Sequence, residues 1–416
     1  MAKYIIKGGI RLDGKIEAES AKNAVLPLLA ASVLTDEEVI IKNCPPILDV
    51  ESMIRILKEL GVKVRYEGKN LIVNASAMHG YTIPYSLSKE MRSSIFMLGA
   101  LISRFKSAEA SYPGGCDIGL RPIDLHLHGL KQMGVKVDEA GGEIVCRAER
   151  LKGGDIYFDF PSVGATENII LAGVLAEGRT VIHNAAKEPE VEDLQHFLNT
   201  MGARVSGAGT SVIVVDGVKK LHGTEYKPLF DRIEAGTYLV AAAATGGEIE
   251  ISNCNAEKIS ALLHKLCDNT CKITVKNDII YLRSGNGRKS FNIETLPYPG
   301  FPTDMQAQMV ALAAVSDGIS VIRENIFETR FKHVRELNRM GANIVVKDRV
   351  AIVSGVKQLA GAKVTAHDLR GGAALIVAGL NAAGTTVIED VRHVERGYYM
   401  PEQKFRALGA DFTRID

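Results

Sequence analysis

The chain has 416 residues, of which 46% are hydrophobic and 24% are charged, without a low-complexity tract. This length is too great for one ordinary hydrophobic core, and it predicts two large domains. The formal net charge of +1 gives no sign of a nucleic-acid or membrane partner, so functional cations must be gathered locally.

The segment from Met1 to Gly14 has too few apolar residues for the core of a signal peptide. Apolar runs such as 235–244 and 371–384 are shorter than the ~20 residues needed to span a bilayer. We therefore expect a cytoplasmic protein that does not associate with membranes. In that compartment its six cysteines are expected to be free thiols.

A short phrase recurs along the chain, in which a glycine is followed by a β-branched strand. It reads Leu60-Gly-Val-Lys-Val, Met133-Gly-Val-Lys-Val, Met201-Gly-Ala-Arg-Val, Met340-Gly-Ala-Asn-Ile and Leu408-Gly-Ala-Asp-Phe. A degenerate copy, Asn269-Thr-Cys-Lys-Ile, fills the double gap between 202 and 341. Amphipathic helices such as 50–60 and 191–201 precede the phrase, so each glycine is expected to end a helix. The chain therefore contains six units of about 70 residues each.

A second recurring element is almost free of charge and precedes the amphipathic helices. It covers residues 22–34, 162–176, 235–245, 305–315 and 369–383. Helices that are apolar all round are buried, and a short strand follows each of them. Packing three units around such helices predicts an α/β fold of two domains, each with three βαβαββ-like repeats, buried central helices and outer sheets, an inside-out α/β barrel. The expected domains are 22–229, and 1–21 with 230–416, with the active site in the cleft between them.

The stretch from Ser111 to His126 departs from the repeat. Pro113 and the glycines at 114, 115 and 119 predict a mobile surface loop with Cys116 at its tip and Arg121 at its far end. Nearby guanidinium charge favours the thiolate, so this cysteine is expected to be reactive, although an inert core cysteine is the common alternative. The distance from strand end to glycine is 22 residues here against 18 in the first and third units. Such an insertion in one repeat usually marks the functional face.

One other group of possible ligands lies at helical spacing, namely His264, Cys267 and Cys271. A structural zinc site needs four ligands, and no fourth candidate is nearby. We therefore expect no metal site.

Polar and charged residues recur at or beside the starts of the buried helices. They are Lys22, Asn23, Arg92, Ser162–Gly164, Arg232, Thr303, Asp304, Asp368 and Arg370, and Arg330 and Arg396 end or follow strands in the fifth and sixth units. Helix starts and arginine forks both bind phosphate and carboxylate, so a cationic cleft for a small polyanionic substrate is predicted. Taken singly, Ser162, Thr303 or Asp304 would be an N-cap, and each arginine a solvated surface residue.

Five motifs together resemble one family, the UDP-N-acetylglucosamine 1-carboxyvinyltransferases. They are Ser20-Ala-Lys-Asn-Ala, the run from Pro113 to His126, Pro161-Ser-Val-Gly-Ala-Thr, Phe301-Pro-Thr-Asp-Met-Gln-Ala-Gln and His367-Asp-Leu-Arg. The resemblance covers essentially the whole chain. It implies transfer of the enolpyruvyl group of phosphoenolpyruvate to the 3-hydroxyl of UDP-N-acetylglucosamine with release of phosphate, the first committed step of peptidoglycan synthesis.

The resemblance also implies roles for individual residues. Asp304 would be the base and Cys116 the acid, with Lys22 and Arg396 also catalytic, and Cys116 could carry a covalent enolpyruvate adduct. Phosphoenolpyruvate would bind Lys22, Asn23, Arg121, Arg330, Arg370 and Arg396. UDP-N-acetylglucosamine would bind Asn23, Arg92, Arg121, Pro122, Ile123, Asp124, Leu125, Ser162, Val163, Gly164, Asp304 and Ile326.

Neither a metal nor another cofactor is implied, and fosfomycin is expected to react with Cys116. The protein is expected to be a monomer or weak oligomer. Phe160 stands where some family members have a lysine, which would weaken one polar contact to the uridine diphosphate. Two alternatives stay open, a shikimate 3-phosphate enolpyruvyl transferase, which lacks this cysteine, and a catalytically silent paralogue that binds the nucleotide sugar.

Overall fold

The computed structural model describes residues 2–114, 118–119 and 122–416. The chain divides into two compact units. The C-terminal unit comprises Met1–Glu19, Phe230–Asp416 and the described pair Ile118 and Gly119, and the N-terminal unit comprises the remaining described chain between Ser20 and Leu229. The N–H of Ala21 donates to the carbonyl of Leu229, and the N–H of Asp231 donates to that of Glu19. The two connecting stretches at residues 19–21 and 229–231 are therefore hydrogen-bonded to each other.

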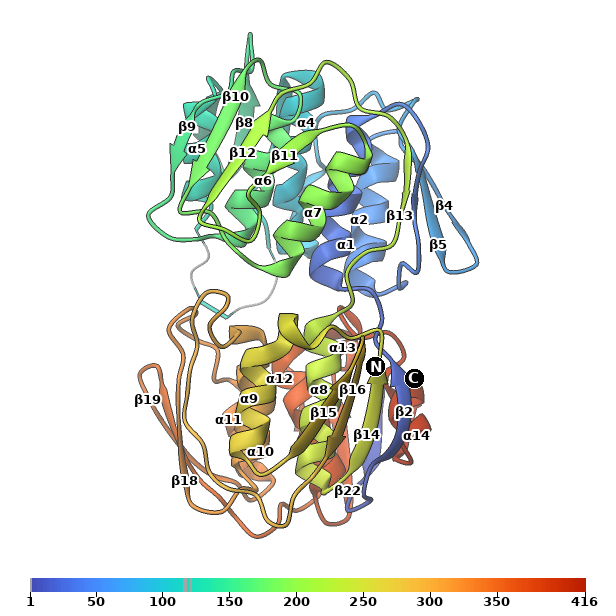
Figure 1. Ribbon diagram of the computed structural model, residues 1–416, viewed down its shortest axis with the longest axis vertical. Coiled ribbons are helices and arrows are strands. Elements are labelled where there is room, and N and C mark those ends of the chain that lie inside the picture. Colours follow the sequence, from blue (N-terminus) through green and yellow to red (C-terminus); the bar gives the residue numbers. More distant parts are fainter. Residues whose placement is uncertain (1, 115–117, 120–121) are drawn as a thin grey trace. The chain divides into compact units, whose positions relative to one another are not determined.

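The N-terminal unit contains the first three repeats (Figure 1). Its helices are α1 (Lys22–Ala31), α2 (Leu48–Glu59), α3 (Tyr85–Glu90), α4 (Phe96–Phe105), α5 (Asp124–Gln132), α6 (Val163–Gly173) and α7 (Pro189–Thr200), with the 3-10 turns η1 (Ser32–Leu34) and η2 (Arg92–Ile95). Its strands are β3 (Val39–Ile41), β4 (Lys63–Glu67), β5 (Asn70–Asn74), β6 (Ser107–Ser111), β7 (Lys136–Ala140), β8 (Glu143–Arg147), β9 (Asp155–Tyr157), β10 (Arg179–His183), β11 (Arg204–Ser206), β12 (Val212–Asp216) and β13 (Thr224–Tyr226).

The C-terminal unit contains the other three repeats and both chain ends. Its helices are α8 (Arg232–Thr245), α9 (Ser260–Asp268), α10 (Gln306–Ala313), α11 (His333–Arg339), α12 (Leu369–Asn381), α13 (Arg392–Glu395) and α14 (Pro401–Ala407), with the 3-10 turns η3 (Ala256–Ile259) and η4 (Thr303–Met305). Its strands are β1 (Lys3–Lys7), β2 (Asp13–Glu17), β14 (Glu248–Ser252), β15 (Lys272–Lys276), β16 (Ile279–Arg283), β17 (Ile293–Glu294), β18 (Ile319–Arg323), β19 (Asn343–Lys347), β20 (Val350–Ser354), β21 (Lys363–Thr365), β22 (Thr385–Glu389) and β23 (Asp411–Ile415).

The described strands form six sheets, one for each predicted repeat. Their orders are β13-β3-β5-β4, β6-β8-β7 and β11-β12-β10-β9 in the N-terminal unit, and β15-β16-β14-β2, β17-β18-β20-β19 and β21-β22-β1-β23 in the C-terminal unit. The start of the chain supplies two strands rather than the expected one. Strand β1 lies between β22 and β23, and β2 pairs in parallel with β14, so the N-terminus completes two sheets of the C-terminal unit.

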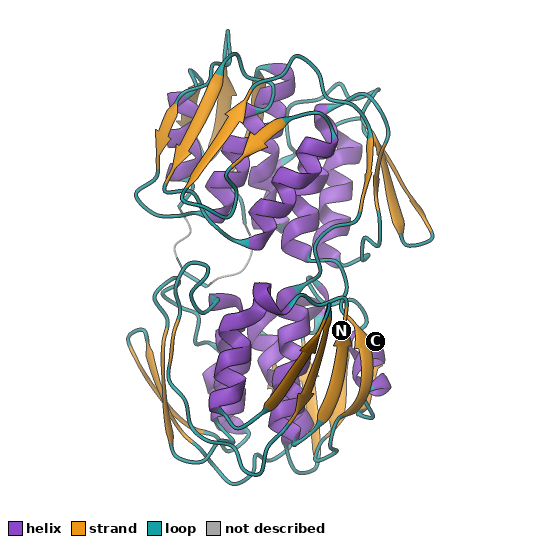
Figure 2. Cartoon of the chain, viewed as in Figure 1, coloured by secondary structure: helices purple, strands orange, loops and turns teal. Residues whose placement is uncertain are grey.

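Buried helices occupy the middle of each unit and the sheets lie outside them (Figure 2). Helices α1, α4 and α6 pack together in the N-terminal unit, and α8, α10 and α12 do so in the C-terminal unit. The α/β class and the buried helices are thus confirmed. The sequence-based prediction missed α4, although its run Phe96-Met-Leu-Gly-Ala-Leu-Ile is as apolar as the other five helices.

The repeated glycine ends an amphipathic helix in every intact copy. Gly61, Gly134, Gly202, Gly341 and Gly409 have φ angles between 86° and 93°, a left-handed conformation that favours glycine. In the degenerate copy Thr270 takes the same conformation, with φ 86°. The six repeats therefore share one helix-ending geometry, and the fourth keeps it with a β-branched residue.

This geometry predicts the cost of adding a side chain at the glycine. Nothing lies within 4 Å of a Cβ at Gly409, so Gly409→Ala is expected to lower the free energy of unfolding by roughly 1–2 kcal/mol through backbone strain alone. A Cβ at Gly61 would also overlap the His79 ring, so Gly61→Ala should cost more. Urea unfolding of both variants measures the difference, and equal stabilities of the two would contradict it.

Candidate functional site

The first group of predicted site residues lies at helix starts of the N-terminal unit. Lys22 is the first residue of α1, and its Nζ lies 3.0 Å from the Asp49 carboxylate in the first turn of α2. Asn23 follows it on the same turn. The Asp49 carboxylate therefore fixes one end of the Lys22 side chain, and the sequence analysis had not identified this partner.

A second cluster of predicted residues forms where α5 and α6 begin. The Arg92 guanidinium donates to the carbonyl of Pro122 at 3.0 Å, which joins η2 to the segment that leads into α5. Ser162 caps α6 by accepting a hydrogen bond from the Ala165 N–H. Gly164 lies so close to α5 that a Cβ there would be 3.1 Å from the His126 ring. Residues 122–125 and 162–164 are thus neighbours.

One buried amide ties this cluster together. Asn168 Oδ1 accepts a hydrogen bond from the Gly99 N–H on α4 at 2.6 Å, and its Nδ2 lies 3.1 Å from His126 Nδ1 on α5. Because Asn168 itself belongs to α6, three helices are held in register by a single side chain. Neither Asn168 nor His126 was assigned a role from the sequence.

The strongest electrostatic feature of the C-terminal unit centres on Asp304 in η4. Arg330 Nη2 donates to Oδ1 at 2.7 Å, and Arg370 Nη2 donates to Oδ2 at 2.8 Å. The Asp304 side chain is 26% exposed, whereas those of Arg330 and Arg370 are 4% and 5% exposed. One partly exposed carboxylate therefore faces two buried guanidinium groups.

The opposite charges in this cluster shift the pKa values of Asp304 and Arg370 so that both charged forms are favoured. Burial raises the pKa of Asp304, but Arg370 and Arg330 outweigh it and hold that pKa well below its ordinary range. Burial lowers the pKa of Arg370, yet Asp304 more than compensates and raises it. Asp304 and Arg370 are therefore both charged at neutral pH.

Arg370 also contacts Tyr398, which belongs to a buried hydrogen-bonded network. Its guanidinium carbon lies 5.9 Å from the Tyr398 ring centroid, and the Tyr398 hydroxyl lies 2.8 Å from Thr237 Oγ1 on α8. Gln308 Nε2 on α10 donates to Thr237 Oγ1 at 3.1 Å. Arg396 is half-buried at the C-cap of α13, two residues before Tyr398.

Cys116 and Arg121 lie outside the described residues, and so does the tip of the cysteine loop. The described pair in that loop, Ile118 and Gly119, belongs to the C-terminal unit. The Thr329 N–H donates to the carbonyl of Ile118 at 3.1 Å, and a Cβ on Gly119 would overlap Glu328. Ile118 and Gly119 therefore adjoin the segment that contains Ile326 and Arg330.

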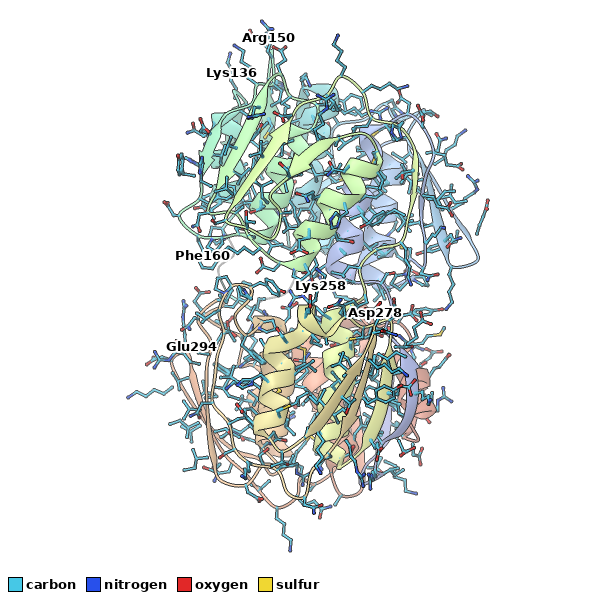
Figure 3. The ribbon with its side chains drawn as sticks, viewed as in Figure 1. Lys136, Arg150, Phe160, Lys258, Asp278 and Glu294 are labelled. Carbon is cyan, nitrogen blue, oxygen red and sulfur yellow. The ribbon has the colours of Figure 1, made fainter. Side chains whose placement is uncertain are left out.

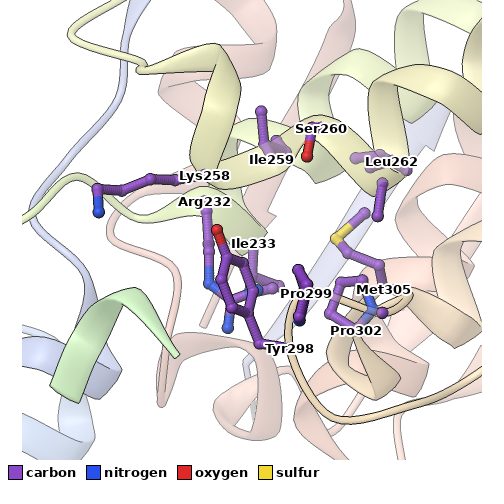
Figure 4. Close-up of a pocket in the computed structure, with 12 residues that line it drawn as sticks. Arg232, Ile233, Lys258, Ile259, Ser260, Leu262, Tyr298, Pro299, Pro302 and Met305 are labelled. Atoms are coloured by element: carbon purple, nitrogen blue, oxygen red, sulfur yellow. The ribbon is translucent and has the colours of Figure 1, made fainter. Parts of the chain in front are cut away.

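The structure also shows where Arg232 and Phe160 lie, two residues that the sequence analysis considered. Arg232, the first residue of α8, lines a small pocket with Tyr298, Pro302 and Met305, and its guanidinium carbon lies 5.8 Å from the Tyr298 ring centroid (Figure 4). Tyr298 is a contact that the sequence pattern did not indicate. Phe160 is 45% exposed in the turn before α6, two residues from Ser162 (Figure 3).

The three possible ligands of the fourth repeat do not share a helix. His264 and Cys267 are exposed on α9, but Cys271 lies beyond the end of that helix and is buried. Helical spacing was thus the wrong description of Cys271, because α9 ends at Asp268. Within the described part of the chain, no group of three or more His, Cys, Asp or Glu side chains could hold a metal ion.

Comparison with known proteins shows which family this chain belongs to. Residues 6–405 match the family model described as EPSP synthase (3-phosphoshikimate 1-carboxyvinyltransferase). A UDP-N-acetylglucosamine 1-carboxyvinyltransferase 2 of Caldanaerobacter subterraneus subsp. tengcongensis is 52% identical, with 100% of both chains covered. The chain belongs to this family of enolpyruvyl transferases.

Further family members agree with this assignment. A UDP-N-acetylglucosamine 1-carboxyvinyltransferase 1 of Symbiobacterium thermophilum is 50% identical, over 99% of this chain and 95% of that protein. Among solved structures, the enolpyruvyl transferase NikO from Streptomyces tendae has a TM-score of 0.88 at 26% identity, with 100% of this chain and 99% of that chain covered. Among the helices searched in the described residues, none is long and apolar enough to span a membrane.

The Asp304 cluster predicts a pH dependence of stability. Because its folded-state pKa is depressed, Asp304 contributes stability above its unfolded pKa near pH ~4, and this contribution is lost as pH falls through the folded value. Asp304→Asn should therefore destabilise the protein by about 1–3 kcal/mol at pH 7, since Arg330 and Arg370 lose their charged acceptor. Thermal unfolding between pH 3 and 8 should show this difference shrinking only at the acid end. A stability difference that grows on acidification would contradict a depressed pKa of Asp304.

Proposed function

We propose that this protein transfers the enolpyruvyl group of phosphoenolpyruvate to the 3-hydroxyl of UDP-N-acetylglucosamine and releases phosphate, the first committed step of peptidoglycan synthesis. The observation that carries the proposal is the full-length match to proteins that have this name, at 52% identity. The Asp304 cluster and the helix starts of the N-terminal unit supply the chemistry.

Phosphoenolpyruvate carries a phosphate and a carboxylate, and both need cationic partners when they leave water. Lys22, Arg121, Arg330, Arg370 and Arg396 supply such charges in the proposal, and Asn23 adds an amide. The buried Nε of Arg330 has no hydrogen-bond partner among the described residues, which supports a ligand-facing role. Planar guanidinium groups bind carboxylate and phosphate oxygens in pairs, which orients the reacting vinyl carbon.

The nucleotide sugar binds the clustered helix starts of the N-terminal unit. Arg92, residues 121–125 and residues 162–164 surround it, and Asn23, Asp304 and Ile326 contact the sugar. The first turns of α5 and α6 present backbone N–H groups toward anionic oxygens. Phe160 offers an apolar surface beside Ser162, so the uridine diphosphate has one polar contact fewer than in members with a lysine there.

The reaction is an addition followed by an elimination. Asp304 accepts the proton of the sugar 3-hydroxyl while the oxygen of that hydroxyl bonds to C2 of phosphoenolpyruvate. Cys116 donates a proton to the C3 methylene. In the tetrahedral ketal that results, the Cys116 thiolate takes a proton back from C3, the C2–O bond to phosphate breaks, and phosphate leaves as the vinyl ether of the product forms. Cys116 could alternatively hold enolpyruvate covalently. In this scheme the cationic side chains of the protein stabilise the negative charges of the substrate in both steps, so no cofactor is needed.

Phosphate release tests the reaction directly. Phosphate should appear when phosphoenolpyruvate is mixed with UDP-N-acetylglucosamine and not with shikimate 3-phosphate, and Asp304→Asn should lower kcat by about 10²–10⁴-fold because the base is lost. Asp278→Asn, an exposed aspartate of the same unit, is the matched control and should keep full activity. Release with shikimate 3-phosphate alone would assign the sister activity, and release with neither would favour a silent paralogue.

Thiol labelling tests the cysteine loop separately. Fosfomycin should alkylate Cys116, and peptide mass spectrometry should locate the adduct there. Burial raises the pKa of the Cys44 thiol to about 12, so that cysteine should stay unlabelled, while the exposed Cys267 reports any non-specific alkylation. An adduct on Cys267 or Cys44 in place of Cys116 would refute the assignment of the loop.

A further inference from the structure

Glu324 is a fully buried acidic residue in the C-terminal unit that no motif had singled out. It comes directly after β18 and is 0% exposed. Its Oε1 accepts hydrogen bonds from Thr295 Oγ1 at 2.9 Å, from the Ile326 N–H at 2.9 Å and from the Phe327 N–H at 3.1 Å. The Thr303 hydroxyl lies within 3.0 Å of both carboxylate oxygens. Two hydroxyls and two backbone N–H groups thus converge on one side chain.

On one side, Glu324 is linked to the Asp304 cluster through Thr303. The Thr303 hydroxyl donates to Glu324 and accepts a hydrogen bond from Arg330 Nη1 at 3.1 Å. Arg330 Nη2 in turn donates to Asp304, the residue next to Thr303. Glu324 therefore orients the hydroxyl that holds one arm of Arg330, while Asp304 holds the other.

On the other side, Glu324 shapes the chain between β18 and Arg330. Its carboxylate accepts from the N–H groups two and three residues ahead, which closes a tight turn at Ile326 and Phe327. Thr295 reinforces this turn, because its hydroxyl also accepts the Asn325 N–H at 2.9 Å. The turn fixes the path of the chain from the end of β18 to Ile326 and, four residues later, to Arg330.

A carboxylate is required for this arrangement. All four groups that face Glu324 are donors here, and an ionised carboxylate accepts only, whereas a glutamine would present an N–H₂ group to at least one of them. Burying such a charge is costly unless its oxygens accept hydrogen bonds, and at Glu324 four donors face Oε1 and the Thr303 hydroxyl also faces Oε2. An apolar residue would be simpler if this position served packing alone.

We propose that Glu324 is a positioning residue, which sets the Asp304–Arg330 geometry through Thr303 and presents Ile326 to the nucleotide sugar. This inference rests on the proposed function, since it assigns Asp304 as base and Ile326 as a sugar contact. The two connections make different contributions. The Thr303 connection acts on the base, so its loss lowers kcat, and the turn acts on substrate binding, so its loss raises the KM for UDP-N-acetylglucosamine.

The test compares isosteric variants by steady-state phosphate release. Glu324→Gln should lower kcat by about 10–100-fold, because sub-ångström displacement of a reacting group costs rates of this order, and should raise the KM for UDP-N-acetylglucosamine. Thr303→Val removes the hydroxyl that links Glu324 to Arg330 but keeps the hydrogen bonds that Glu324 accepts from the N–H groups of the turn, so it should lower kcat with a smaller change in KM. Thr303→Ser keeps the hydroxyl and should restore kcat.

Hydrogen exchange provides a readout that does not depend on activity. The amides of Ile326 and Phe327 should exchange faster in Glu324→Gln than in the wild type, and Thr303→Val should leave them protected. Glu336→Gln is the matched control, because Glu336 is also a buried glutamate of this unit and accepts the Thr365 N–H. It should leave both the exchange at residues 326–327 and the kinetics unchanged.

The outcomes separate this proposal from the proposed function. If the wild type releases no phosphate with UDP-N-acetylglucosamine, the proposed function fails, whatever the exchange data show. If the wild type turns over but folded Glu324→Gln keeps kcat and KM within twofold, the positioning role is overturned. Should Glu324→Gln not fold, equal kcat values for Thr303→Val and Thr303→Ser would overturn the role through Thr303.

Discussion

Arg330 and Arg370 are almost fully buried, and the carboxylate of Asp304 accepts a hydrogen bond from each of them. Two guanidinium groups this deep in a protein need a shared anion, because their mutual repulsion and their lost hydration are otherwise uncompensated. The same anion keeps a pKa far below its usual range, since both cations stabilise its charge. The cluster thus holds a reactive carboxylate and two anion-binding groups in one fixed geometry.

The repeated architecture explains why such groups are found at equivalent places. Each unit packs three apolar helices at its centre, and their first turns are the points where polar side chains and free N–H groups can gather. Lys22, Ser162, Asp304 and Arg370 all lie in or directly before the first turn of a central helix. The repeat supplies the positions, and the individual side chains differ from one copy to the next.

Buried polar side chains then give the approximate repeats a unique packing. Asn168 joins α4, α5 and α6, Gln308 with Thr237 joins α10 and α8 to Tyr398, and Glu324 joins η4 to the turn after β18. Buried hydrogen bonds of this kind favour one arrangement among similar apolar packings, because another arrangement would break them and leave more buried groups without partners.

The sequence by itself determined the six repeats, the buried helices, the glycine helix ends and the helix-start positions of the site residues. Each of these depends on local spacing, which a one-dimensional pattern preserves. It did not reveal α4 as a central helix or place Cys271 beyond the end of α9. Only the tertiary structure showed that Asp304 meets Arg370, 66 residues away, and that Glu324 meets Thr303, 21 residues away. Such pairs depend on how separate helices and strands pack, and the spacing of residues along a chain does not specify that packing.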